Sequence, residues 1–203
     1  MKAEMTEPTT SVESREATFH AHPVTADMWP DLEKLFGTRG ACGGCWCMYW
    51  VLRQSTYTEQ KGEGNKVALH ARIISGEEPG ILGYLGDKPV AWCAIQPRER
   101  YNVLERSKIL APVDNELVWS IVCLFVAKEH RHKGLTVEMI KYAVTHARDR
   151  GARIVEAYPV EPKGPGEVPP AFAWTGLASA FRQAGFTEVA RRSETRPVMR
   201  LST

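Results

Sequence analysis

The chain has 203 residues, of which 43% are hydrophobic and 25% charged, and its formal net charge is +2. These values are typical of a globular single-domain protein and do not indicate a nucleic-acid partner. No hydrophobic run approaches the ~20 residues that a membrane span needs, so we expect no membrane partner. Five cysteines without a secretory signal favour a reducing, cytoplasmic location over a disulfide scaffold.

The composition divides the chain into three parts. Residues 1–16 are polar and acidic, which predicts a disordered N-terminal tail. Residues 17–203 are expected to form a single domain. Within it, residues 37–60 form an insert rich in glycine, cysteine and tryptophan.

The first half of the chain predicts a strand, two helices and a hairpin. Thr25 is a candidate N-cap, Gly76 a helix stop, and Gly86-Asp87 a tight turn between two strands. In chain order, these elements are expected over residues 17–24, 26–36, 67–74, 80–85 and 89–96.

The second half predicts a strand, a long helix and a further strand, followed by a short helix and a strand pair. The strand at 116–126 is the most β-like segment, and Gly151 ends the helix that begins after Gly134. The other predicted elements are a short helix within 98–110, a strand at 152–158, an irregular loop at 161–170, a short helix after Thr175, and strands at 186–191 and 197–201. The strand–helix–strand unit implies one parallel crossover in an otherwise antiparallel sheet.

The most informative segment is the turn between the strand ending at Val126 and the following helix. Backbone N–H groups at a helix N-terminus lack intrahelical partners and lie at the positive end of the helix dipole, so they bind phosphate. Gly134 permits close approach, and Arg131, His132 and Lys133 add positive charge. Physical chemistry alone therefore predicts an anion site here, with an ordinary solvated turn as the alternative.

These residues resemble the GNAT superfamily of CoA-dependent N-acyltransferases. Arg131 and Gly134 match the family's Arg/Gln-x-x-Gly-x-Gly/Ala loop, and Leu124-Phe125-Val126 matches the apolar strand before it. Thr136 replaces the final small residue of the motif. The hairpin at 80–96, the Ala184-Gly185-Phe186 sequence and the element order also agree with the family.

The resemblance implies an α+β (mixed α/β) fold with a GNAT-like, mostly antiparallel sheet of six to seven strands and helices on both faces. It implies acetyl-CoA as co-substrate. The backbone of Leu124, Phe125 and Val126 would pair with the pantetheine arm, and the pyrophosphate would be held by Arg131, His132, Lys133, Gly134, Leu135 and Thr136. Whether the protein forms a homodimer is left open.

The catalytic residues are less clearly indicated because the chain departs from the family pattern. Ser120 occupies the position of the family's usual Glu base, which leaves Glu116 as a candidate acting through water. The positions of the usual Tyr acid and of a frequent Asn are Phe181 and Trp174. Tyr158 is the remaining candidate hydroxyl near the thiolate. The expected catalytic set is thus Glu116, Ser120 and Tyr158.

The insert carries the sequence Cys45-Trp46-Cys47-Met48-Tyr49-Trp50, preceded by Cys42. Its cysteines raise the hypothesis of a zinc site, completed by Cys93 or His70, but a structural site needs four ligands and no second compact pair follows. We expect no metal. The favoured interpretation is an aromatic wall for an apolar acceptor, built from Trp46, Met48, Tyr49 and Trp50. Cys123 is expected to be core, and Arg98 and Arg100 are candidates for attracting an acidic acceptor.

The leading hypothesis from the sequence is an N-acetyltransferase in which the amine of a small molecule attacks acetyl-CoA directly. The missing family Glu, Asn and Tyr favour an alternative, a CoA-binding sensor or interaction domain with little or no catalysis.

Overall fold

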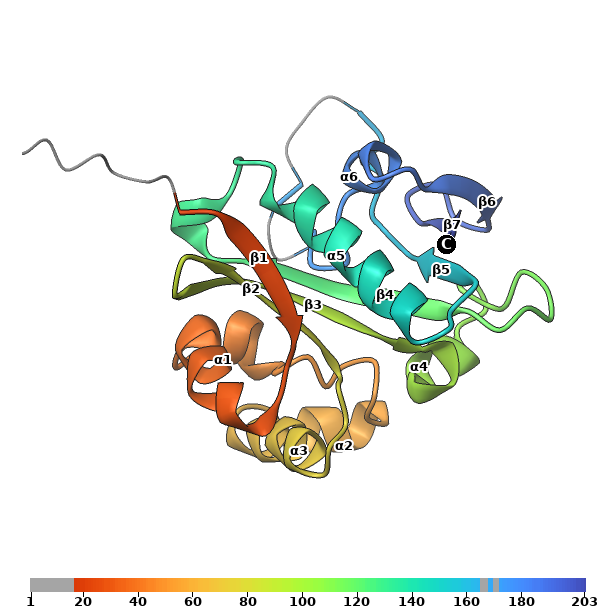
Figure 1. Cartoon of the computed structure of the whole chain (residues 1–203). Helices are drawn as coiled ribbons and strands as arrows, with labels where there is room; N and C mark the ends of the chain where they lie inside the picture. The colour runs from red at the N-terminus through yellow and green to blue at the C-terminus, as the bar shows by residue number, and fades with distance from the viewer. Residues whose placement is uncertain (1–16, 165–167, 170–171) are drawn as a thin grey trace, which may run out of the picture.

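The computed structural model describes residues 17–164, 168–169 and 172–203. They form one seven-stranded sheet with strand order β1-β2-β3-β4-β5-β7-β6. Only β4 and β5 pair in parallel, and every other neighbouring pair is antiparallel. The predicted mixed, mostly antiparallel sheet is confirmed. Helices cover both of its faces, with α5 and α6 on one side and α1, α2 and α3 on the other (Figure 1).

The first half of the chain builds one edge of the sheet and the helices beneath it. Strand β1 is followed by a helical pair, an irregular glycine-rich turn, two further helices and the predicted hairpin. The bounds are β1 Phe19–Pro23, η1 Ala26–Met28, α1 Trp29–Phe36, η2 Gly40–Gly44, α2 Gln54–Glu59, α3 Glu63–Ile74, β2 Gly80–Leu85 and β3 Lys88–Pro97.

The second half supplies the central strand and the opposite edge. The bounds are η3 Arg98–Arg100, α4 Asn102–Arg106, β4 Trp119–Val126, η4 Lys128–His130, α5 Leu135–Asp149, β5 Ile154–Ala157, α6 Ala178–Gln183, β6 Thr187–Arg191 and β7 Pro197–Ser202.

Several element predictions need correction. The helix expected within 98–110 is only the five-residue α4, because the backbone is already extended at Ser107. The helix expected from Thr175 begins at Ala178, after an extended Leu177. Helix α2 was not predicted. The expected tail at 1–16 and part of the expected loop at 161–170 lie outside the described residues.

Two hydrophobic cores sandwich the sheet. One lies between the sheet and the helices of the first half, and it contains Leu32, Leu69 and Trp92. The other lies under α5 and α6 and contains Met139, Ile140 and Phe181. Helix α5 therefore buries its apolar stripe on the face opposite the insert, which fixes the turn that precedes it against the end of β4.

A β-bulge interrupts β4 near its centre. Ala94 of β3 pairs with Cys123, but the next residue, Ile95, pairs with Ile121, so Val122 has no opposite partner. Val122 and Cys123 consequently both face the first core, although strand side chains normally alternate. The bulge turns Cys123 and Phe125 toward the insert and leaves Leu124 facing α5.

One buried histidine predicts how folding stability depends on pH. His146 of α5 is buried against Trp119, and neither ring nitrogen has a hydrogen-bond partner among the described residues. Burial, reinforced by the Arg150 cation, lowers its pKa from 6.5 to about 4. The unfolded chain therefore takes up a proton that the folded protein does not, and the free energy of unfolding should fall as the pH drops from about 6.5 toward 4.

The His146→Leu variant should flatten this acid limb by an amount on the order of 2 kcal/mol. Urea denaturation at several pH values between 7 and 4 would measure it. His22→Leu is the matched control, because His22 is exposed on β1 and its loss should leave the slope unchanged. An equally steep acid limb in His146→Leu would contradict this role.

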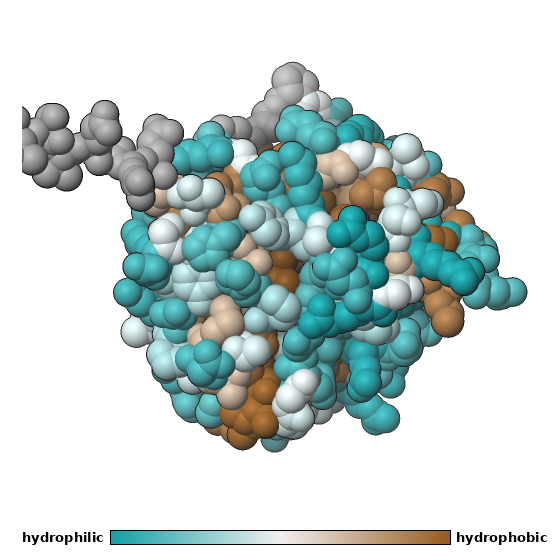
Figure 2. Space-filling view, viewed as in Figure 1, coloured by the Kyte–Doolittle hydropathy of each residue, from teal (hydrophilic) through white to brown (hydrophobic). Residues whose placement is uncertain are grey.

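The molecular surface seen in Figure 2 is mostly hydrophilic, with small and separate hydrophobic areas. In the described parts of the chain, no helix combines the length and the apolar character required to cross a bilayer.

Candidate active site

The turn between β4 and α5 presents a row of free backbone amides. Within the described residues, the N–H groups of residues 132–136 donate to no protein acceptor, and the first helical bonds are those of Val137 and Glu138 to the Gly134 carbonyl. His132 and Gly134 both have positive φ, 59° and 77°, which turns the chain back on itself. A Cβ at Gly134 would meet nothing within 4 Å, so this surface is open. Free amides and an open surface at a helix N-terminus are the arrangement that favours the binding of an anion.

The charged residues of this turn differ in what they do. His132 and Lys133 are exposed, whereas Arg131 is half-buried and its Nε donates to the Val126 carbonyl at 3.0 Å. That bond ties the turn to the end of β4. Leu135, by contrast, is the first residue of α5 and its side chain is buried, so only its backbone can meet a ligand.

Strands β4 and β5 separate immediately beyond their shared start. They pair only over Trp119–Ile121 and Val155–Ala157, after which β4 continues without its neighbour. The edge so exposed is not entirely free, however. The Leu124 amide donates to the Trp174 carbonyl at 2.7 Å. The segment before α6 therefore occupies the Leu124 amide, one of the backbone groups that the resemblance assigns to the pantetheine arm.

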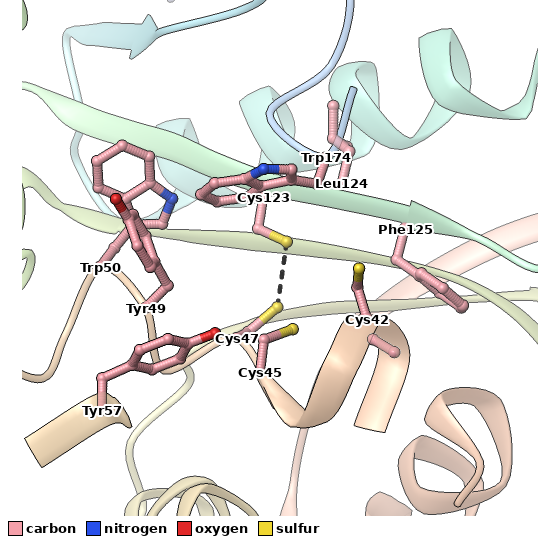
Figure 3. A pocket seen from close by; sticks show the side chains of 11 residues that line it. Cys42, Cys45, Cys47, Tyr49, Trp50, Tyr57, Cys123, Leu124, Phe125 and Trp174 are labelled. Atoms are coloured by element: carbon pink, nitrogen blue, oxygen red, sulfur yellow. Dashed lines mark hydrogen bonds between the residues drawn. The ribbon is translucent and has the colours of Figure 1, made fainter. Parts of the chain in front are cut away.

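A cavity of about 240 Å³ opens against the second half of β4. Its walls come from the insert, α2, β4 and the segment before α6. The rings of Tyr49, Trp50, Tyr57 and Trp174 gather at one end, the Phe125 ring lies at the other, and the thiols lie between them (Figure 3). The lining residues are Ala41, Cys42, Cys45, Cys47, Tyr49, Trp50, Tyr57, Cys123, Leu124, Phe125 and Trp174.

Strained backbone shapes the insert where it borders this cavity. Ala41, Trp46 and Cys47 have positive φ although none is glycine. Gly40, also at positive φ, lies under the Trp46 ring, where a Cβ would approach to 2.2 Å. Such conformations cost of order 1–3 kcal/mol each and persist where the surroundings enforce them. Here the surroundings include the Trp50 Nε1–H bond of 2.9 Å to the Val122 carbonyl at the bulge.

The insert supplies only part of the aromatic wall that its sequence predicts. Tyr49 and Trp50 line the cavity, but Trp46 and Met48 turn into the first core and are 4% and 1% exposed. Tyr49 contacts Trp50, Tyr57 and Trp174 edge-on, at ring-centroid distances of 5.1, 5.5 and 5.2 Å. These edge-to-face contacts fix the wall in one conformation.

Two thiols connect the insert to β4. Cys47 Sγ–H donates to Cys123 Sγ at 3.2 Å and accepts from Trp92 Nε1–H at 3.0 Å. The bond to Cys123, together with burial, raises the pKa of Cys47 well above its ordinary value. Cys47 is therefore a neutral thiol near pH 7, and so is Cys45, whose pKa burial raises to about 11.

The described residues contain no cluster of three or more His, Cys, Asp or Glu side chains able to hold a metal ion. Cys93, considered as a zinc ligand from the sequence, lies in the second core on the opposite face of the sheet from Cys47. His70 instead packs its ring against Trp29, 4.4 Å away.

Ser120 and Tyr158 lie together, but inside a closed polar network. The Tyr158 hydroxyl donates to Glu156 Oε1 at 2.6 Å and lies 2.8 Å from Ser120 Oγ. Arg98 Nη1 donates to the same hydroxyl and to Glu156. Burial and the Glu156 charge raise the pKa of Tyr158. Neither Ser120 nor Tyr158 lines the cavity.

Glu116 lies apart from both of these residues. It is exposed just before β4, and with Glu99 it lines a second, shallow hollow at the opposite end of that strand. The structure thus brings together two of the three predicted catalytic residues and leaves the third elsewhere. Arg98 cannot attract an acceptor from its buried network, whereas Arg100 is exposed on η3.

Several lining residues were not predicted as such. Cys123 is a buried core residue, as expected, but beyond the bulge it also lines the cavity. Trp174 had a signal, because it occupies a position where the family often carries a functional Asn. Tyr57 had none, since α2 was not predicted.

No curated protein sequence matches the chain. Three solved structures share its fold at low identity. An acetyltransferase of the GNAT family from Listeria monocytogenes has a TM-score of 0.57 at 10% identity, covering 91% of this chain and 95% of that chain. A GNAT-family acetyltransferase from Streptococcus agalactiae has a TM-score of 0.55 at 9% identity, with coverages of 93% and 97%.

The third is the PaiA N-acetyltransferase from Thermoplasma acidophilum, solved in complex with coenzyme A. Its TM-score is 0.52 at 10% identity, and the match covers 92% of this chain and 99% of that chain. The model of the acetyltransferase (GNAT) family matches residues 46–164, which include the cavity-lining end of the insert, β4 and the turn before α5. From its sequence match and its fold, the chain belongs to the GNAT acetyltransferase family.

Proposed function

We propose that this protein transfers an acetyl group from acetyl-CoA to an amine of a small molecule, by direct attack of the amine on the thioester. The observation that carries the proposal is the row of free amides at residues 132–136, placed where β4 ends and α5 begins. A diphosphate there would accept from several N–H groups at the positive end of a 15-residue helix. His132 and Lys133 would add charge from the solvent side, while Arg131 would hold the turn.

The path of the cofactor follows from the separation of β4 and β5. A pantetheine arm leaving the turn would run along Val126 and Phe125 toward the cavity. One of its amide carbonyls would replace the Trp174 carbonyl as the acceptor of the Leu124 N–H. The thioester would then reach the cavity near Cys123. Binding of the acceptor beside the thioester supplies the main rate enhancement, because the reaction of two correctly placed reactants becomes effectively unimolecular. The backbone of β4 is the candidate for polarising the carbonyl.

Ser120 and Tyr158 act, in this proposal, from behind the site. Their network with Glu156 joins β4 to β5 at the point where the strands begin to separate. We therefore assign them to positioning the two strands rather than to proton transfer. Glu116 keeps a role only through a chain of water molecules, since it lies at the far end of β4.

A second candidate, a CoA-binding sensor without turnover, is favoured by one observation. The described residues that line the cavity include no carboxylate or imidazole to act as a general base. Two measurements distinguish the candidates. Calorimetry with coenzyme A tests the shared binding site, and thiol release from acetyl-CoA across a panel of amines tests turnover. Binding with turnover supports the transferase, binding without turnover supports the sensor, and absence of binding contradicts both.

A further inference from the structure

The cavity is distinguished by its chemistry, because the described side chains that line it include no carboxylate, imidazole, ammonium or guanidinium group. Its ionisable groups are thiols and phenols only. Burial raises the pKa of Cys45 to about 11 and that of Tyr57 to about 12, and the pKa of Cys47 is higher than its ordinary value as well. The titratable groups that face the cavity are Cys42, Cys45, Cys47 and Tyr49 from the insert, Tyr57 from α2, and Cys123 from β4.

Two cations lie close to this wall. Arg196, in the turn before β7, donates from Nη1 to Thr175 Oγ1 at 2.9 Å, directly behind Trp174, and its charge acts on Tyr49. Lys61, after α2, lies beside Gly43 of the insert. A cationic acceptor would thus enter a low-dielectric space in which the described lining residues offer no anion and near which two cations lie. Burying an unpaired charge in this way is strongly unfavourable.

We infer that the acceptor is a neutral aromatic amine of the aniline type, in which the nitrogen is attached directly to the ring. The inference rests on the proposed acetyl transfer at this site. Two properties of the cavity support it: the absence of a counter-charge or base, and the aromatic wall of Tyr49, Trp50, Tyr57 and Trp174.

The nitrogen of an arylamine is neutral at pH 7 because its lone pair is delocalised into the ring. An alkylammonium titrates near the lysine value of about 10.4, so fewer than about one molecule in a thousand is neutral at that pH. An enzyme without a base in its cavity can use only that fraction. The cavity also fits one ring in size, since a hydrophobic space of about 150 Å³ already holds benzene and this one measures about 240 Å³.

The reaction balances without any further group. The amine nitrogen attacks the thioester carbonyl, an N–C bond forms and the C–S bond breaks. The proton lost by the nitrogen passes to the departing thiolate, giving the acetanilide and free coenzyme A. The missing family Glu and Tyr are then no obstacle to catalysis.

The test compares 4-methylaniline with 4-methylbenzylamine, which differ by one methylene between ring and nitrogen. Thiol release from acetyl-CoA would be followed for each amine between pH 6.5 and 9. We expect 4-methylaniline to be turned over at pH 7. Because a delocalised lone pair is also a weaker nucleophile than that of a neutral alkylamine, the discriminating readout is the pH dependence of kcat/KM for each amine rather than their ratio at one pH. For 4-methylbenzylamine, kcat/KM should rise about tenfold per pH unit up to pH 9, while that for 4-methylaniline should stay nearly flat.

A charge-introducing variant tests the electrostatic cause. Cys42 is exposed at the cavity rim, so Cys42→Asp should fold and should place a carboxylate beside the acceptor. We expect this variant to shift the selectivity toward 4-methylbenzylamine by about tenfold at pH 7. The neutral isostere Cys42→Asn is the control and should keep the original selectivity.

Three results would overturn the inference. The first is equal use of both amines at pH 7 with no pH dependence for the alkylamine, because a base or anion must then serve the site. The second is coenzyme A binding with turnover of other amines but of neither test amine. The third is a selectivity shift in Cys42→Asn as large as that in Cys42→Asp. Failure to bind coenzyme A at all would instead contradict the proposed function itself.

Discussion

The Gly134→Glu variant is expected to bind coenzyme A at least about 100-fold more weakly than the unmodified protein, a loss of about 2.7 kcal/mol in binding free energy. Two effects act together. The new carboxylate would lie at the amides that are expected to hold the diphosphate, and like charges placed in contact cost several kcal/mol. The side chain would also cover the open surface above the turn, where a Cβ now meets nothing within 4 Å. Titration calorimetry with coenzyme A measures the effect.

Gly151→Glu is the matched control for this variant. Gly151 follows the opposite end of α5, has a φ of +84°, and is as open as Gly134, so the two substitutions impose similar backbone strain and the same change of net charge. The control should bind coenzyme A normally. Equal affinity in Gly134→Glu and Gly151→Glu would remove the turn from the cofactor site.

Replacement of Arg98 by methionine should destabilise the fold by about 3 kcal/mol, the typical effect of breaking a buried ion pair from one side. The Arg98 guanidinium donates to Glu156, to Tyr158 and, through Nη2, to the carbonyls of Leu104 and Leu110. Glu156 is only 1% exposed and would keep Arg200 and the Tyr158 hydroxyl as its remaining partners. Urea denaturation at pH 7 measures the loss.

The neighbouring Arg100 provides the control, because it lies exposed on the same short helix and its replacement by methionine should change stability by less than about 0.5 kcal/mol. The double variant Arg98→Met/Glu156→Gln should recover part of the lost stability, since it removes the Glu156 charge that no longer pairs with Arg98. A stability within about 0.5 kcal/mol of the unmodified protein in Arg98→Met would show that the network contributes little.

Local sequence patterns were sufficient to predict β4, α5 and the β2–β3 hairpin. The β-branched run before Val126, the apolar stripe of α5 and the Gly86-Asp87 turn each specify their structure within a few residues. The glycine turn before α5 was predictable for the same reason, because Gly134 at the start of a helix is a local feature. These parts of the fold and the site follow from short-range chemistry.

The acceptor end of the site depends on contacts between distant segments, and single residues do not reveal those. Trp50 reaches the Val122 carbonyl across 72 positions, and Cys47 reaches Cys123 across 76. Ser120 was included in the expected catalytic set because it stands at the family's Glu position, and Tyr158 because its hydroxyl was expected near the thiolate. Arg98 and Glu156 instead join both residues in a closed network. The sequence also could not show which aromatic residues of the insert face the cavity. The positive φ angles of Trp46 and Cys47 help to decide that Tyr49 and Trp50 line it while Trp46 turns into the first core.

The extra residue in β4 makes the length of that strand a determinant of chemistry. With Val122 unpaired, Cys123 and Phe125 line the acceptor space and Leu124 packs toward α5. Loss of Val122 would restore simple alternation with Cys123 and Phe125 still facing the insert, but it would remove the carbonyl to which Trp50 Nε1–H donates. A single codon deletion at this point could thus release Trp50 from the acceptor wall and change the specificity of a protein of this fold, with the turn before α5 left intact.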